Sequence, residues 1–182
     1  MDHTTERSEK IVEAFTGQFS EMLRQWVHSI GESEAVTLDE LEEMVRGGLH
    51  AVGRNVLEGL IDIVGTGKTA ESVPCPRCGK AMGFVRYQGK WVQTLLGAIR
   101  PERAYFHCAE CRQGHVPLDH QLGLGVDSLS GGLEEVLCLL AARMPLEETA
   151  DTLRRLLMLQ VDDNTVQRAM LRVGSELAAQ QE

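Results

Sequence analysis

Four cysteines in two close pairs constrain the fold of this chain more than any other feature of its sequence. Each pair has the form Cys-x-x-Cys, and the residues are Cys75 and Cys78, then Cys108 and Cys111. Two cysteines separated by two residues can direct both thiolates at one cation, and a tetrahedral shell of four thiolates is typical of structural zinc. The 29 residues between the pairs fit a hairpin that brings them together. We therefore predict one structural Zn²⁺ ion bound by these four residues.

The residues next to the two pairs bear on this ligand set. Gly79 follows the first pair and lets the backbone turn tightly, whereas the glycine of the second pair is displaced to Gly114. His107 and His115 flank the second pair and are alternative ligands, and four free cysteines at coincidental spacing are a further alternative. The fifth cysteine, Cys138, lies on the apolar face of a predicted helix, where we interpret it as a core residue.

Composition indicates the cellular compartment of the protein and the oxidation state of its cysteines. The chain has 182 residues, of which 43% are hydrophobic, and this allows one domain or two small ones. No apolar run approaches the ~20 residues that a membrane-spanning helix requires, and residues 1–10 lack the apolar segment of a signal peptide. We expect a cytoplasmic protein without a membrane partner, in which reduced thiols bind metal rather than form disulfides.

Apolar residues recur every three or four positions in the first segment, which predicts two long helices. In the first helix they are Ile11, Phe15, Phe19, Met22, Trp26 and Ile30. We expect this helix to end at Gly31 and the second to begin at Thr37, which fits a capping box with Glu40. Glycines in the second helix allow close helix approach. We predict a helical hairpin over residues 1–69 that packs on the rest of the chain or on a second copy, because two helices alone bury little.

The segment from Gly65 to Thr69 resembles a phosphate-binding loop only superficially. That motif needs a glycine five residues before Gly67, where this chain has Asp62. It also needs a helix immediately afterwards, and Pro74 follows in place of one. We therefore interpret the segment as a linker.

The remaining chain divides into a ribbon at 70–120 and a helical bundle at 121–182. We predict a strand at 82–87 and a hairpin of 91–96 with 99–107 that turns at Gly97-Ala98. Three helices should follow, one around Leu133 and Leu137, one after Pro145 and one capped by Asp162. The predicted fold class is mostly α with a small β zinc ribbon: an N-terminal helical hairpin, a four-cysteine zinc ribbon and a C-terminal three-helix, helix-turn-helix-like bundle.

Charge is distributed unevenly, and the only positive segment contains the cysteines. The whole chain has a net charge of −9, while residues 74–120 hold 7 basic and 3 acidic side chains, net +4. The basic residues there are Arg77, Lys80, Arg86, Lys90, Arg100, Arg103 and Arg112, with Tyr87, Trp91 and Tyr105 interleaved. Such side chains can neutralise phosphates and pack on sugars or bases, which favours contact with double-stranded DNA. The alternative is an ordinary solvated surface whose aromatic residues support the hairpin.

The start of the last predicted helix resembles that of a DNA-recognition helix. There a small polar residue caps the helix, and exposed residues of its first turns meet base edges. The candidate contacts are Asn164, Thr165, Gln167, Arg168 and Arg172. Two features oppose this interpretation: seven residues separate Leu153 from Val161, and Asp162 and Asp163 repel phosphate. A plain three-helix bundle is the alternative.

Several short motifs in order resemble the N-terminal region of bacterial insertion-sequence transposases of the Kra type, over roughly residues 70–175. They are CPRCG at 75–79, LLGAIR at 95–100, RAYFHC at 103–108, GHVPLD at 114–119, LGLG at 122–125, LEETA at 146–150 and NTVQR at 164–168. The resemblance implies that the ribbon and the helix-turn-helix hold transposon-end DNA for a later DDE-type nuclease domain. That domain uses three carboxylates to hold two divalent cations.

No such catalytic core is recognisable here, because the acidic residues fall on helical faces. We therefore expect no transposase catalysis by this polypeptide alone, whether it is a fragment, a first reading frame or a standalone protein. The favoured function is a DNA-binding module of transposase origin, associated with the nucleoid. The alternative is a zinc-braced protein-interaction or oligomerisation module that regulates or joins another complex, as a homodimer or with a partner protein bound through the N-terminal helices.

Overall fold

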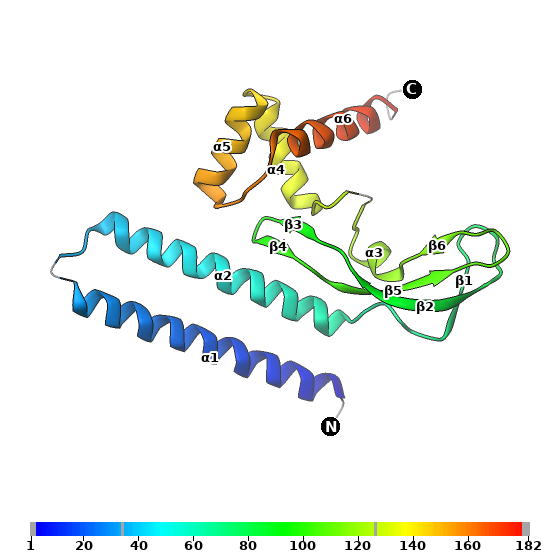
Figure 1. Ribbon diagram of the computed structural model, residues 1–182, viewed down its shortest axis with the longest axis horizontal. Helices are drawn as coiled ribbons and strands as arrows, with labels where there is room; N and C mark the ends of the chain where they lie inside the picture. Colours follow the sequence, from blue (N-terminus) through cyan, green and yellow to red (C-terminus); the bar gives the residue numbers. More distant parts are fainter. Residues whose placement is uncertain (1–2, 34, 126, 180–182) are drawn as a thin grey trace. The chain divides into compact units, whose positions relative to one another are not determined.

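The computed structural model describes residues 3–33, 35–125 and 127–179 of the chain, and its contacts divide into two compact units. The first unit consists of Met1–Gly89 and Arg100–Leu118, and the second of Lys90–Ile99 and Asp119–Glu182. The fold is mostly helical, with an N-terminal helix pair, small β-sheets that include the four-cysteine region, and three C-terminal helices (Figure 1). This confirms the predicted fold class, while the division at residues 69 and 120 stays a prediction.

The helix pair consists of α1 (His3–Glu32) and α2 (Leu38–Val64). The predicted capping box is confirmed: the Thr37 hydroxyl accepts from the Glu40 N–H, and the Thr37 N–H donates to the Glu40 carboxylate at 2.8 Å. Helix α1 ends one residue beyond the expected Gly31. Helix α2 ends at Gly65, whose φ of +91° is a conformation that glycine adopts without steric cost.

Two glycines of α2 let α1 approach closely. Trp26 and Met22 pack over Gly48, where an added Cβ would lie 2.1 Å from the Trp26 ring. Phe15 packs over Gly59 in the same way, further along α2. The earlier residues of α1 meet the later residues of α2, so the helices run antiparallel, as Figure 1 also shows.

The segment after α2 packs on the ribbon. Thr66 accepts a hydrogen bond from the Ala104 N–H at 2.8 Å, which ties the segment to strand β5 (Glu102–His107). Gly67 passes so close to Leu118 that a Cβ would lie 2.7 Å from the Leu118 nitrogen. The Lys68 ammonium lies 4.2 Å from the centre of the Phe84 ring. These contacts give the segment a structural role as a connection between the helix pair and the sheet.

The ribbon is an antiparallel sheet in the order β1-β2-β5-β6. Apart from β5, its strands are β1 (Ser72–Pro74), β2 (Ala81–Gly89) and β6 (Gly114–His115). A bulge interrupts the β2–β5 pairing between Phe84 and Arg86. Met82, Ala104 and Phe106 are buried together with two of the cysteines, so the sheet and the cysteine cluster share one small core.

The predicted hairpin of residues 91–96 with 99–107 is partly wrong. Strand β3 (Val92–Thr94) pairs with β4 (Gly97–Ile99), so the turn falls at Leu95-Leu96 and not at Gly97-Ala98. The Thr94 hydroxyl stabilises this turn by accepting from the Leu96 N–H and donating to the Gly97 carbonyl. The expected strand over 99–107 is broken before β5 by Pro101, which has no N–H to donate to a sheet. Strand β5 therefore pairs with β2.

The C-terminal region contains α4 (Gly131–Ala141), α5 (Leu146–Leu157) and α6 (Asp163–Ala179), after the short helix α3 (Pro117–Gln121). The three longer helices pack around one buried cluster: Leu129, Leu133, Leu137, Leu153, Leu159, Val161, Val166 and Ala169. Asp162 caps α6 as predicted, because its carboxylate accepts from the Thr165 N–H at 2.8 Å. Among the described residues, the helices fall short of the length and apolarity that a membrane span needs.

Candidate metal centre

The two cysteine pairs adopt the same backbone turn. In the first, the Cys75 N–H donates to the Lys80 carbonyl at 2.8 Å; in the second, the Cys108 N–H donates to the Gln113 carbonyl at 2.9 Å. The residue after each pair has a left-handed conformation, with φ of +72° at Gly79 and +57° at Arg112. The two turns therefore match residue by residue and present their cysteines from two sides of one site.

The prediction of a displaced glycine at Gly114 is corrected by this geometry. The left-handed position of the second turn is occupied by Arg112, although a residue with a Cβ adopts that conformation at a cost. Gly114 has a different role on β6. An added Cβ there would lie 2.7 Å from the hydroxyl of Tyr105, so Gly114 leaves room for that ring to lie over the strand. The sequence signal at Arg112 was the equal spacing from its pair, not its residue type.

The four sulfur atoms form a compact cluster. The Sγ atoms of Cys75 and Cys111 are 3.5 Å apart, and those of Cys78 and Cys108 are 3.6 Å apart. All four lie within 4.8 Å of one another. A tetrahedral ion with bonds of about 2.3 Å to sulfur requires sulfur separations of about 3.8 Å, so the cluster has the size of one such ion. The separations are far longer than the ~2.05 Å of a disulfide bond, and the cysteines are free.

The cluster lies at the boundary between core and solvent. Cys75 and Cys108 are buried, Cys111 is half-buried and Cys78 is exposed. The apolar side chains beneath it come from β2 and β5, chiefly Met82 and Phe106. Apolar surroundings disfavour an isolated thiolate, so charge on these sulfur atoms needs a cation or hydrogen bonds to compensate it.

The pKa values of the thiols reflect this competition. Burial raises the pKa of Cys75, but N–H groups of Cys78 and Arg77 and the neighbouring thiols outweigh burial and lower that pKa to about 7. Burial, together with the adjacent thiols, raises the pKa of Cys111 to about 12. The site by itself thus favours one thiolate and opposes a second. A bound divalent cation would stabilise all four thiolates, which is the chemistry that this donor set fits.

The structure gives no support to the histidine alternatives. Among the described residues, the cluster that could hold a metal ion consists of the four cysteines, without His107 or His115. Both histidines are half-buried on strands, and His107 is paired with Gly83 and with Gly114. Cys138 lies on α4 outside the cluster, half-buried, and burial raises the pKa of its thiol. The four cysteines therefore could hold one metal ion.

The basic residues of the ribbon segment differ in their exposure. Those whose side chains are exposed are Arg77, Lys80, Arg86, Arg100 and Arg112. Arg77, Lys80 and Arg112 belong to the two cysteine turns, so the structure gathers them around the cluster. Lys90 is half-buried and donates to the Gly125 carbonyl at 2.6 Å. Arg103 is only 6% exposed, which leaves its guanidinium little access to a phosphate.

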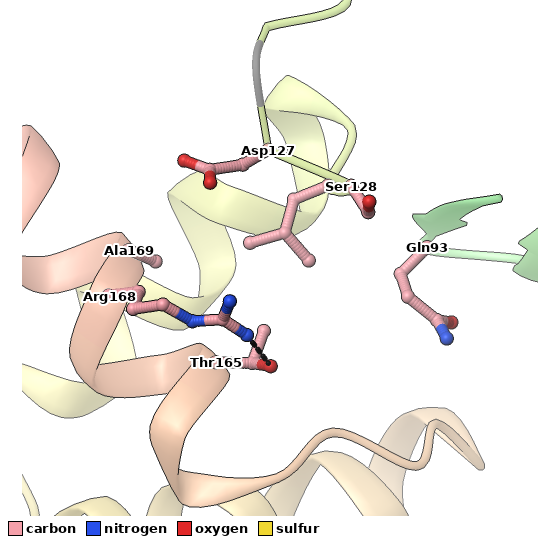
Figure 2. Close-up of a pocket in the computed structure, with 7 residues that line it drawn as sticks. Gln93, Asp127, Ser128, Thr165, Arg168 and Ala169 are labelled. Carbon is pink, nitrogen blue, oxygen red and sulfur yellow. Dashed lines mark hydrogen bonds between the residues drawn. The ribbon is translucent and has the colours of Figure 1, made fainter. Parts of the chain in front are cut away.

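The residues proposed for base contact occupy the first turns of α6. Asn164, Gln167 and Arg168 are exposed. Thr165 donates its N–H and its hydroxyl to Asp162, and the Thr165 N–H is the main reason that the pKa of Asp162 lies below its usual value. Arg168 donates to the Thr165 hydroxyl at 3.1 Å beside a cavity of about 350 Å³ (Figure 2). The cavity is lined by Gln93, Asp127, Ser128, Leu129, Thr165, Arg168 and Ala169.

The charge of Arg172 is used in ion pairs within the C-terminal region. Its guanidinium pairs with Asp127 at 2.8 Å, with Glu134, and with Glu176 at 3.4 Å. Three carboxylates thus compensate one positive charge, so a phosphate would have to displace them.

Comparison with known proteins does not place this chain in a family: no family model matches it, and no curated protein matches its sequence.

Proposed function

We propose that the four cysteines bind one structural zinc ion and that the resulting ribbon is part of a DNA-binding module. The observation that carries the proposal is the gathering of Cys75, Cys78, Cys108 and Cys111, with every Sγ within 4.8 Å of the others. Zinc would link the two turns and stabilise a sheet whose core is otherwise small.

Four thiolates complete the tetrahedral shell and leave no position for water or substrate. The proposed metal is therefore structural, and we propose no catalysis at it. Its effect on function is indirect, because it holds the exposed side chains of the two turns in a defined arrangement.

Two basic surfaces support the DNA-binding part of the proposal, one in each unit. The first is formed by Arg77, Lys80 and Arg112 around the cysteine cluster, in a segment whose net charge is +4 within an acidic chain. Basic side chains of this kind anchor phosphates without reading sequence. The second is the exposed start of α6, where Asn164, Gln167 and Arg168 would contact bases or phosphates. The resemblance of several short motifs to those of Kra-type transposases favours transposon-end DNA as the target and a transposase origin for the module.

Salt-dependent binding to a short duplex of mixed sequence tests the DNA proposal on zinc-loaded, full-length protein. Arg77→Glu and Arg168→Glu each reverse an exposed charge on a proposed surface and should weaken binding and lower its salt dependence. Arg143→Glu makes the same charge change at an exposed position between α4 and α5 and is the matched control. If wild-type protein shows no salt-dependent binding, or if Arg143→Glu weakens it as much, the DNA proposal is wrong. Zinc content, measured separately, tests the metal proposal.

A further inference from the structure

The helix pair has almost no core of its own. Neither α1 nor α2 contributes to the two buried clusters of the described residues, and α2 has no buried residue. Where the two helices meet at Gly48 and Gly59 of α2, the rings of Trp26 and Phe15 that lie against them are only half-buried. Isolated helices gain most of their stability from packing an apolar face, so this pair has apolar surface left to bury.

On α1 that surface is a stripe beside the contact with α2. It consists of Val12, Phe19, Leu23, Val27 and Ile30, and Val27 is 72% exposed. At about 100° per residue, these five side chains fall within roughly 80° of the helix circumference. Around the helix axis, this stripe is rotated by about 80° from the side of α1 that contacts α2, counting the rotation toward the C-terminus.

Helix α2 carries a corresponding stripe of Val45, Leu49, Leu60 and Val64, and Leu49 is 51% exposed. It lies about 100° from the direction of Gly48 and Gly59, again counted toward the C-terminus. Because the two helices are antiparallel, equal rotations along each chain direction lead to the same side of the pair. The two stripes therefore lie on one side of the pair, which we name the hairpin face.

Charged residues are largely turned away from the hairpin face. Glu21 and Arg24 lie on the other side of α1, and Arg54 and Glu58 lie on the other side of α2, by the same 100° rotation. The charged residues that do fall within the face are Glu9 on α1 and the oppositely charged Glu42 and Arg46 on α2, so its net charge is small. Although residues 1–73 have a net charge of −8, two copies that met through this face would keep most of that charge apart. An apolar, weakly charged face fits a copy of itself, because an isologous contact pairs like with like.

The size of the face also suits a dimer. Helix α2 has 27 residues and is about 40 Å long at about 1.5 Å per residue. Two helices side by side, each about 10 Å across, make the face about 20 Å wide, so it covers on the order of 800 Å². That is about the area that each partner buries in a stable interface of standard size.

We propose that the hairpin face binds the hairpin face of a second copy of this chain and forms a four-helix bundle. The dimer goes beyond the zinc and DNA proposals and depends on neither. Each copy would cover the apolar stripes of the other, and the ribbons would lie outside the bundle core.

Sedimentation or light scattering of zinc-loaded, full-length protein over a range of concentrations tests this proposal. Wild-type protein should have twice the 20.1 kDa mass of one chain. The double variant Leu23→Glu, Leu49→Glu places charges in the face and should raise the dimer dissociation constant by about 100-fold or more. The control Gln25→Glu, Ala51→Glu adds the same charges to exposed positions on the other side of the same helices and should stay dimeric.

Helix content and zinc content of both variants show whether they are folded. A folded wild-type protein that is monomeric at every concentration overturns the proposal, and so does a folded Leu23→Glu, Leu49→Glu variant that dimerises like wild type. Loss of DNA binding in a protein that still dimerises would instead count against the DNA proposal alone.

Discussion

The ribbon and the helix pair lie in the same compact unit, and both have small hydrophobic cores. They differ in what is available to stabilise them. The ribbon buries Met82 and Phe106 beside four convergent cysteines, so one metal ion can complete it from within. The helix pair has regular helices, a good N-cap and close contacts at two glycines, but no buried side chain in α2. A well-formed helix is thus no proof of a sufficient core. In our proposals, one region is completed by a metal ion and the other by a second copy.

Removing a cysteine should produce the largest difference between the two regions. Cys108→Ser eliminates a buried ligand, and the protein should lose most of the roughly 10–16 kcal/mol that structural zinc contributes. Hydrogen exchange should become fast in β2 and β5 and stay slow in the centres of α1 and α2. Cys138→Ser, outside the cluster, is the control. Protection of β2 and β5 that survives Cys108→Ser would mean that the ribbon does not depend on metal.

Acid should weaken metal binding by the ribbon, as the loss of a cysteine does. Cys111, with its pKa raised to about 12, is protonated at neutral pH without metal, and Cys75, with a pKa of about 7, is half protonated. Zinc must displace these protons, so its affinity rises with pH and falls as pH falls, by at least about tenfold per unit below pH 7. A chelator competition at several pH values measures this. A flat profile would contradict thiolate ligation.

Replacing a glycine of the helix pair by alanine should have a smaller effect on stability. The sign of that effect depends on whether the other helix packs against the glycine. Gly48→Ala brings a Cβ into the Trp26 ring and should destabilise the pair by about 1–2 kcal/mol, because the clash exceeds the gain in helix propensity. Gly17→Ala meets no atom within 4 Å and should stabilise α1 by up to about 1 kcal/mol. Thermal unfolding followed by helix content measures both. Equal effects of the two substitutions would show that Trp26 does not pack on Gly48.

The smallest expected effect distinguishes the two cysteine turns. Arg112→Gly relieves a left-handed conformation and should stabilise the ribbon by about 0.5–1 kcal/mol, whereas Gly79→Ala should destabilise it by about 1–2 kcal/mol. Denaturant unfolding of the zinc-loaded protein measures both changes. If both substitutions changed the free energy of unfolding in the same direction, the two turns would not match.

Local patterns were sufficient to predict much of this fold. The Cys-x-x-Cys spacing predicted each half of the cluster, and Thr37 with Glu40 predicted the start of α2, because each of these depends on residues within one turn of each other. Strand pairing was harder to predict. The expected hairpin failed because Pro101 separates β4 from β5 and because β5 pairs with β2, which lies more than ten residues away. The contacts with DNA stay predictions.

Spacing and charge can be counted along the chain, so the sequence alone was enough to locate the start of α2, the four cysteines that belong together and the positive segment. Only the folded chain reveals that Arg112 occupies the turn position of a glycine, that Arg103 is buried and that three carboxylates surround Arg172. It also places the apolar stripes of α1 and α2 on one side. The physical reason is that burial and charge pairing depend on residues that are distant in sequence, and a one-dimensional pattern does not record which of them meet.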